Sequence, residues 1–121
     1  MNMLAEFDKG EIKQVALWLR NGMNIGANRV NENPLRWLHR SRSDGYEACA
    51  LGFVLIGKIN DIESTFRVYE ETRAGQTSFD SHRRTMIGLT EIQPELLDLI
   101  HAVHYYQRIP ALTIHRYLDQ A

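Results

Sequence analysis

Cys49 is the only cysteine of the chain, so cysteine catalysis has a single candidate nucleophile. A nucleophilic thiol needs a helix N-terminus or a nearby imidazole to ionise, together with access to substrate. Four of the five histidines could approach it, namely His39, His101, His104 and His115. The neighbours Ala50 and Leu51 instead favour a buried cysteine that packs as a small hydrophobic side chain. We therefore expect no catalytic residue, and a cysteine-dependent enzyme is kept as an alternative.

Asp98, His101 and His104 follow one another at three-residue steps, which raises the question of a metal site. Ligands for one metal must lie on one helix face, whereas three-residue steps drift around the helix axis by about 60° each. A complete site would need a further ligand from elsewhere, such as His82 or His115. We interpret the two histidines as partly exposed side chains beside a solvated Asp98, and we expect no metal and no cofactor.

The most concentrated charge of the sequence lies around Trp37, where Arg36, His39, Arg40 and Arg42 fall within seven residues. Arginine beside an exposed aromatic ring can bind phosphate or stack on bases, and it equally suits a protein surface rich in carboxylates. If Trp37 points inward, the same residues form only a solvated face. Nucleic acid is the least favoured ligand, because 14 Lys and Arg against 15 Asp and Glu leave a net charge of -1. We expect these five residues to bind an acidic protein partner.

The C-terminal residues 109–118 read IPALTIHRYL. This segment resembles the turn and recognition helix of helix-turn-helix proteins of the pipsqueak and transposase type. The resemblance implies that Thr113, His115 and Arg116 face the major groove of DNA. Residues 91–121, however, hold four acidic side chains against two arginines, the reverse of the charge of most DNA-binding domains. A corner between two helices that closes the core explains the same residues, so DNA binding is an alternative function.

Residues 48–57, ACALGFVLIG, carry no charge and form the segment that the other elements must surround. A half-exposed helix or strand would show polar residues with a period of 3.6 or 2, so this segment belongs in the core. Ten residues are too few to cross a bilayer as a helix, which takes about 20. Phe53, Val54 and Ile56 would also suit a strand, but the helix formers of residues 47–51 favour a helix.

The elements around this segment show mainly helical periodicity. Asp8 is a candidate cap for a first helix, which Asn21-Gly22 should end, and Asp61 is a candidate cap for the helix that follows the central one. Pro34 favours the first turn of a short helix, and Asp44-Gly45 a break. The further helices are predicted at residues 34–40, 62–73, 79–87, 90–107 and 111–119. We predict an all-α fold, a single compact bundle of five or six helices around a buried central helix.

Length and composition place the chain in one domain, residues 1–121. Hydrophobic residues make up 44% and charged residues 24% of the sequence, which is typical of globular proteins. A single cysteine fits a reducing compartment, and the N-terminus carries acidic residues where a signal peptide carries basic ones. We expect a cytoplasmic location, in a bacterial cell or an infected host cell, and no association with membranes.

The central residues 48–52, ACALG, together with the layout of the predicted helices, resemble small uncharacterised accessory proteins of phages and bacteria. The resemblance implies a genomic context and no activity. We predict a non-enzymatic accessory or inhibitor protein, encoded by a phage or mobile element, that binds a host protein. A homodimer through one face of the predicted helix 90–107, extended by Tyr105 and Tyr106, is a further expectation.

Overall fold

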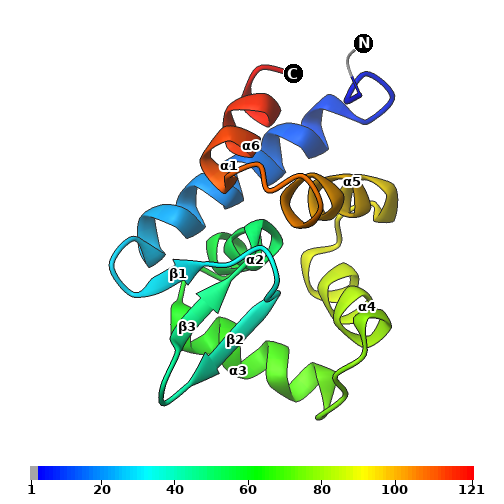
Figure 1. The fold of residues 1–121 in the computed structure, drawn as a ribbon. Helices are drawn as coiled ribbons and strands as arrows, with labels where there is room; N and C mark the ends of the chain where they lie inside the picture. The colour runs from blue at the N-terminus through cyan, green and yellow to red at the C-terminus, as the bar shows by residue number, and fades with distance from the viewer. Residues whose placement is uncertain (1–2) are drawn as a thin grey trace.

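The computed structural model describes residues 3–121, which are mostly helical and also contain a small sheet (Figure 1). The helices are α1 (Lys9–Gly26), α2 (Ala50–Ile59), α3 (Ile62–Arg73), α4 (Phe79–Thr90), α5 (Pro94–Tyr105) and α6 (Ala111–Asp119). The strands are β1 (Val30–Glu32), β2 (Leu38–Ser41) and β3 (Gly45–Ala48). No helix among the described residues is both long and apolar enough to cross a membrane.

Helix α2 lies at the centre of the fold, as the uncharged segment predicts. Every residue from Ala50 to Gly57 is buried, and the helix contacts α1, α3, α4, α5 and β3. It ends at Asn60, whose φ of 69° is the left-handed conformation that closes many helices. The prediction of an enclosed central helix is confirmed, although α2 begins at Ala50 because the preceding residues 45–48 form β3.

Helices α1 and α2 cross at two glycines with their backbones in contact. A Cβ atom on Gly22 would lie 1.7 Å from the carbonyl oxygen of Phe53, and one on Gly57 would lie 1.7 Å from that of Trp18. Gly22 therefore does not end α1, as the sequence suggested, but lies inside a helix that continues to Gly26. From the sequence, Asn21-Gly22 looks like the end of a helix. The glycine is instead needed for packing against α2 at Gly57, which lies 35 residues further along the chain.

The all-α prediction is wrong for residues 30–48, which form a three-stranded sheet in the order β1-β3-β2. Strand β3 pairs with β1 in parallel and with β2 antiparallel. The predicted helix at residues 34–40 is absent, because Pro34 lies inside a turn in which the amide of Arg36 donates to the carbonyl of Asn33. Asp44-Gly45 breaks the chain as predicted, but as the turn between β2 and β3, with Gly45 at a φ of 69°.

The remaining helices close the fold on both sides of α2. Helix α3, capped by Asp61 as predicted, packs beside β2 and against α2, and α6 lies alongside α1 (Figure 1). Helix α4 continues past Gly88 to Thr90, and α5 begins only at Pro94, so the single helix predicted from residue 90 starts four residues later. Helix α4 packs against α2 and α3, and α5 packs against α2 and α6.

Candidate functional site

The five residues predicted to bind a partner do not share one surface. Trp37 is buried, and the alternation of side chains along β2 sends Arg40 toward α3 and His39 to the opposite face. Arg36 and Arg42 are exposed, and neither side chain makes a hydrogen bond or ion pair with any residue that the structure describes. The five residues therefore do not form the continuous patch that the predicted helix at residues 34–40 would have given.

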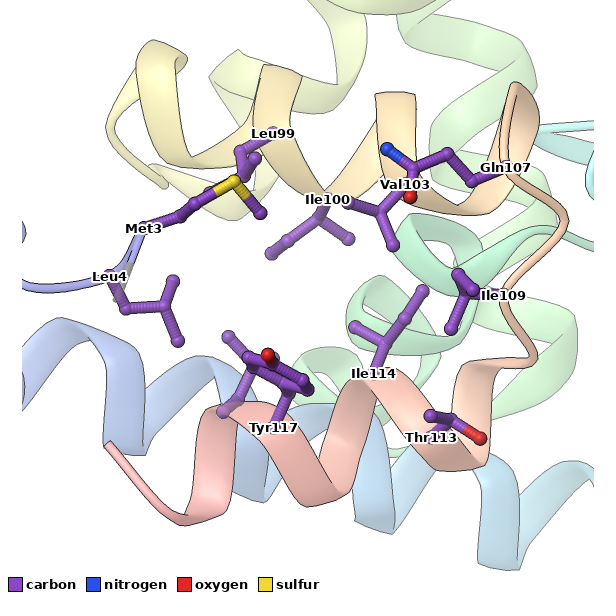
Figure 2. A pocket seen from close by; sticks show the side chains of 11 residues that line it. Met3, Leu4, Leu99, Ile100, Val103, Gln107, Ile109, Thr113, Ile114 and Tyr117 are labelled. Atoms are coloured by element: carbon purple, nitrogen blue, oxygen red, sulfur yellow. The ribbon is translucent and has the colours of Figure 1, made fainter. Parts of the chain in front are cut away.

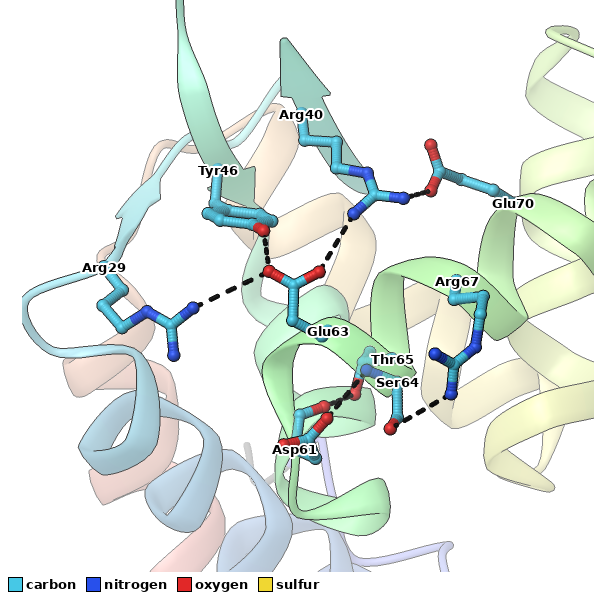
Figure 3. Close-up of polar contacts among 9 residues, drawn as sticks. All are labelled: Arg29, Arg40, Tyr46, Asp61, Glu63, Ser64, Thr65, Arg67 and Glu70. Atoms are coloured by element: carbon cyan, nitrogen blue, oxygen red, sulfur yellow. Dashed lines mark hydrogen bonds and ion pairs between the residues drawn. The ribbon is translucent and has the colours of Figure 1, made fainter. Parts of the chain in front are cut away.

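Arg40 is held at the surface of the molecule by a network of polar contacts with α3 (Figure 3). Its guanidinium lies 3.2 Å from Glu63 and 2.7 Å from Glu70. Glu63 also accepts a hydrogen bond from the hydroxyl of Tyr46 and lies 3.8 Å from Arg29. Partial burial acts to lower the pKa of Arg40, but the hydrogen bonds to its partners outweigh it and the pKa rises. Arg40 thus fastens the sheet to α3, which leaves it poorly suited to bind another molecule.

Trp37 is the base of a cluster of aromatic rings and imidazoles that we call the ring surface. The Trp37 ring stacks on His101 at 4.5 Å between centroids and on His82 at 6.2 Å. Phe79 meets the Trp37 ring edge-on at 5.7 Å and the His101 ring at 5.3 Å. The ring surface consists of Trp37, Phe79, His82, His101, Tyr105 and Tyr106. It joins the segment before β2 to the first turn of α4 and the last turns of α5.

The outer rings of this cluster are open to solvent, whereas its base is not. Phe79 is 55% exposed and Tyr106 is 73% exposed, while Trp37 and His101 are 8% and 7% exposed. Tyr105 stacks on His101 at 5.1 Å and meets Tyr106 edge-on at 4.8 Å, so the rings are in contact from the buried base to the exposed edge. Helix α4 thus turns Phe79 away from the core.

A bidentate ion pair fixes the two helices that carry these rings. Arg83 donates to both carboxylate oxygens of Asp98, at 2.8 and 2.9 Å. Arg83 lies one helical turn after Phe79, and Asp98 lies one turn before His101, so the pair sets the distance between the two rings. The hydrogen bond from Arg83 also lowers the pKa of Asp98 below its ordinary value. Asp98 is therefore a positioning carboxylate rather than the metal ligand considered from the sequence.

Both imidazoles of the ring surface favour the neutral form. Burial, assisted by the charge of Arg73, lowers the pKa of His82 to about 4. Burial also lowers the pKa of His101, despite the nearby carboxylate of Asp98. The Nδ1 atom of His82 is hydrogen-bonded to the hydroxyl of Tyr69 at 2.5 Å, but the buried Nε2 of His101 has no partner among residues 3–121. The ring surface thus contains one buried polar atom whose hydrogen-bonding capacity is unused.

Comparisons with known proteins assign no family to this chain. No protein-family model, curated protein sequence or solved structure matches it.

Cys49, the candidate nucleophile, is buried at the end of β3, where it precedes the first turn of α2. Its side chain is 3% exposed, and burial raises the pKa of the thiol to about 11. A thiol with so high a pKa and so little access to solvent lacks both properties that a nucleophile needs. Cys49 lies at a helix N-terminus, as many reactive cysteines do, but it is surrounded by core residues.

His104 connects the N-termini of two helices. Its Nδ1 atom accepts a hydrogen bond of 3.1 Å from the backbone amide of Ala50, so the proton must lie on Nε2, which donates to Glu32 at 2.9 Å. Glu32 in turn accepts from the backbone amide of Ala111 at 3.0 Å. The hydrogen bond from His104 lowers the pKa of Glu32, against the effect of burial. With both nitrogens occupied, His104 is not free to act as a base for Cys49.

The three residues assigned to DNA contact do not lie on one face of α6. Thr113 lies beside an apolar cavity, His115 is half-buried, and Arg116 is exposed. The buried face of the helix is formed by Ala111, Ile114 and Leu118. Ile114 lies between Thr113 and His115, so these two side chains leave the helix on opposite sides of the buried stripe. This arrangement favours the second interpretation of the segment, a corner that closes the core against α1.

The apolar cavity lies between α5, α6 and the N-terminal segment (Figure 2). Its volume is about 210 Å³, and its lining contains no charged side chain. Figure 2 shows Leu99, Ile100 and Val103 of α5 on one side and Ile114 and Tyr117 of α6 on the other. A small apolar group fits such a space, and the polar side chains of its lining are Gln107, Thr113 and Tyr117.

Proposed function

We propose that this protein is a non-enzymatic binding factor that contacts a protein partner through the ring surface. The observation that carries the proposal is the exposure of Phe79 and Tyr106 above the buried rings of Trp37 and His101. Tryptophan and tyrosine are enriched among the residues that contribute most to protein binding, and such residues act best when a rigid layer supports them. The exposed rings are supported in this way, because both Phe79 and Tyr106 meet the buried ring of His101 edge-on.

The charges beside the ring surface support a partner that presents carboxylates. Arg108 lies over the Tyr105 ring at 5.5 Å and is exposed. Arg36, next to Trp37 in the chain, is exposed and unpaired within the described residues. Arginine at the rim of an aromatic patch mainly raises the association rate and the specificity for an acidic partner. The acidic partner expected from the sequence is thus kept, with Phe79, Tyr106 and Arg108 in place of His39 and Arg40.

The test is the affinity of the partner for matched variants. The intact protein captures its partner from the cells that produce it, and the purified pair is then measured by calorimetry. We expect the double variant Phe79→Ala, Tyr106→Ala to bind at least about 30-fold more weakly, since residues of this kind contribute roughly 2 kcal/mol or more. Arg36→Ala and Arg108→Ala should each weaken binding a few-fold, and more at low salt than at high salt.

Two single variants provide controls for general effects of exposed apolar residues. Leu17 is 60% exposed on α1 and Tyr117 is 62% exposed on α6, and neither belongs to the ring surface. Leu17→Ala and Tyr117→Ala should leave the affinity unchanged. An affinity lost in Tyr117→Ala but kept in the double variant would move the binding site to the cavity of Figure 2 and refute the proposal.

Variants of the ring surface also test the expected homodimer, because Tyr105 and Tyr106, at the end of α5, form the outer edge of the ring surface. If two copies of the chain join there, the protein is dimeric in solution and the double variant is monomeric. We propose that the partner is a different protein. In that case, sedimentation should give a monomer for the unchanged protein and for the double variant alike. That the chain is a phage or mobile-element factor acting on a host protein remains a proposal carried by the resemblance of residues 48–52.

A further inference from the structure

The β2–β3 hairpin carries a second group of polar side chains, away from the ring surface. Among the residues that the structure describes, His39, Asp44 and Glu47 each offer one ligand atom, and these three atoms lie within 4.8 Å of one another. His39 and Glu47 are directly paired across the two strands, and Asp44 lies in the turn that joins them. The network of Arg40 with α3 occupies the other face of β2, so it does not use these three side chains.

The separation of the first two ligand atoms is the one that a zinc ion requires. The Nε2 atom of His39 lies 3.4 Å from Oδ2 of Asp44. In a tetrahedral site with metal–ligand bonds of about 2.0 to 2.1 Å, neighbouring ligand atoms are about 3.4 Å apart. The ligand atom of Glu47 completes the group, since all three atoms lie within 4.8 Å of one another. A metal ion placed here would replace the hydrogen bond between Nε2 and Oδ2.

Hydrogen bonds outside the group hold two of its members in position. The side-chain amide of Asn33 donates to Oε2 of Glu47 at 2.8 Å. The backbone amide of Asp44 donates to the hydroxyl of Ser41 at 2.8 Å, which fixes the turn that carries the carboxylate. Partners of this kind orient ligands in known metal sites, and their loss typically weakens binding by about 10- to 100-fold.

We infer that His39, Asp44 and Glu47 bind one divalent transition-metal ion, with Zn²⁺ as the best fit. An imidazole with two carboxylates suits Zn²⁺, whereas Ca²⁺ and Mg²⁺ prefer six or more oxygen ligands. Three protein ligands leave a fourth position of the tetrahedron for water or for a group from another molecule. The site is independent of the proposed binding function, because none of its ligands belongs to the ring surface.

The test is calorimetric titration of the intact protein with ZnCl₂, compared with four variants. We expect one zinc ion per chain, with binding at least tenfold weaker in His39→Ala and in Glu47→Ala. Asn33→Ala should bind about tenfold more weakly through loss of the hydrogen bond to Glu47. His115→Ala, which removes a half-buried histidine on α6, should bind as the unchanged protein does.

A fifth variant separates the site from adventitious binding by the thiol. Cys49→Ser must keep zinc affinity, because Cys49 is buried and is not a member of the group. Circular dichroism of each titrated variant shows whether weakened binding comes from unfolding, and His39→Gln, which keeps a polar side chain on β2, is titrated in place of His39→Ala if that variant does not fold. Absence of zinc binding in the folded unchanged protein overturns the inference, as does full affinity in His39→Ala, loss of affinity in His115→Ala or Cys49→Ser, or tighter binding of Ca²⁺ than of Zn²⁺.

Discussion

Helix α5 carries two buried histidines, His101 and His104, whose surroundings differ completely. His104 has both nitrogens hydrogen-bonded, one to the amide of Ala50 and one to Glu32, and it joins elements from three parts of the chain. His101 is stacked among aromatic rings, and its Nε2 is unpaired within residues 3–121. Both histidines are buried, but their roles differ. His104 stabilises the fold, whereas His101 supports a surface that is open to solvent.

Removal of the His104 side chain should produce the largest effect on stability. His104→Ala leaves the buried amide of Ala50 without an acceptor, and an unpaired buried group costs about 1–3 kcal/mol. It also removes one of the two donors to Glu32, which keeps the amide of Ala111, and it deletes a buried ring from the core. We expect a loss of about 3 kcal/mol in the free energy of unfolding, measured by urea denaturation. A loss below about 1 kcal/mol would show that His104 is no more structural than His101, and the comparison would fail.

Acidification should weaken the fold through the histidines of the ring surface. The pKa of His82 falls from 6.5 to about 4 on folding, and that of His101 is lowered as well. The unfolded chain therefore binds more protons than the folded one once the pH drops below 6.5, so stability present above that pH is lost progressively toward about pH 4. The carboxyl groups with lowered pKa, such as Glu32, contribute a similar loss only below their unfolded value of 4.5.

The measurement is the free energy of unfolding between pH 7 and 5, above the range of the carboxyl groups. We expect stability to fall with pH in the unchanged protein and to fall less steeply in a His101→Phe variant, which has one titrating group fewer. Identical slopes in the two proteins would show that His101 does not take part.

Replacement of His101 by phenylalanine should have the smallest effect on stability at neutral pH. Phe keeps a ring of similar shape against Trp37 and removes the unpaired Nε2, and replacing an unsatisfied polar group by an apolar one is nearly neutral or stabilising. We expect a change within about 1 kcal/mol in urea denaturation, in contrast to His104→Ala. A loss as large as that of His104→Ala would indicate that Nε2 has a partner essential to the fold.

The sequence predicts the core of this protein better than its surface. The uncharged segment around α2 and the caps Asp8 and Asp61 follow from local patterns, and each is confirmed. The sheet does not follow, because its strands are only three or four residues long and mix polar with apolar side chains. Its parallel pair joins Val30 to Tyr46, a relation that no local periodicity reveals. Local rules therefore assigned a helix to residues that long-range pairing holds in a strand.

The candidate site was only partly predictable for the same reason. Trp37 was singled out as the ring of an arginine-rich patch, whereas its aromatic neighbours come from α4 and α5 and meet it only in the folded chain. The four-residue spacing of His101 and Tyr105 was the one local sign that these rings share a face. The residues of the proposed metal site have no helical spacing in the sequence, because His39 and Glu47 become neighbours only across a hairpin.

The most direct test of the central claim is site-specific photo-crosslinking in the cells that produce the protein. A photoreactive phenylalanine derivative placed at position 106 reports on the ring surface, and one placed at Leu17, which is exposed on α1, is the matched control. The ring surface as binding site predicts a single crosslinked protein from position 106 and none from position 17. A partner crosslinked from position 17 and absent from position 106 would contradict it.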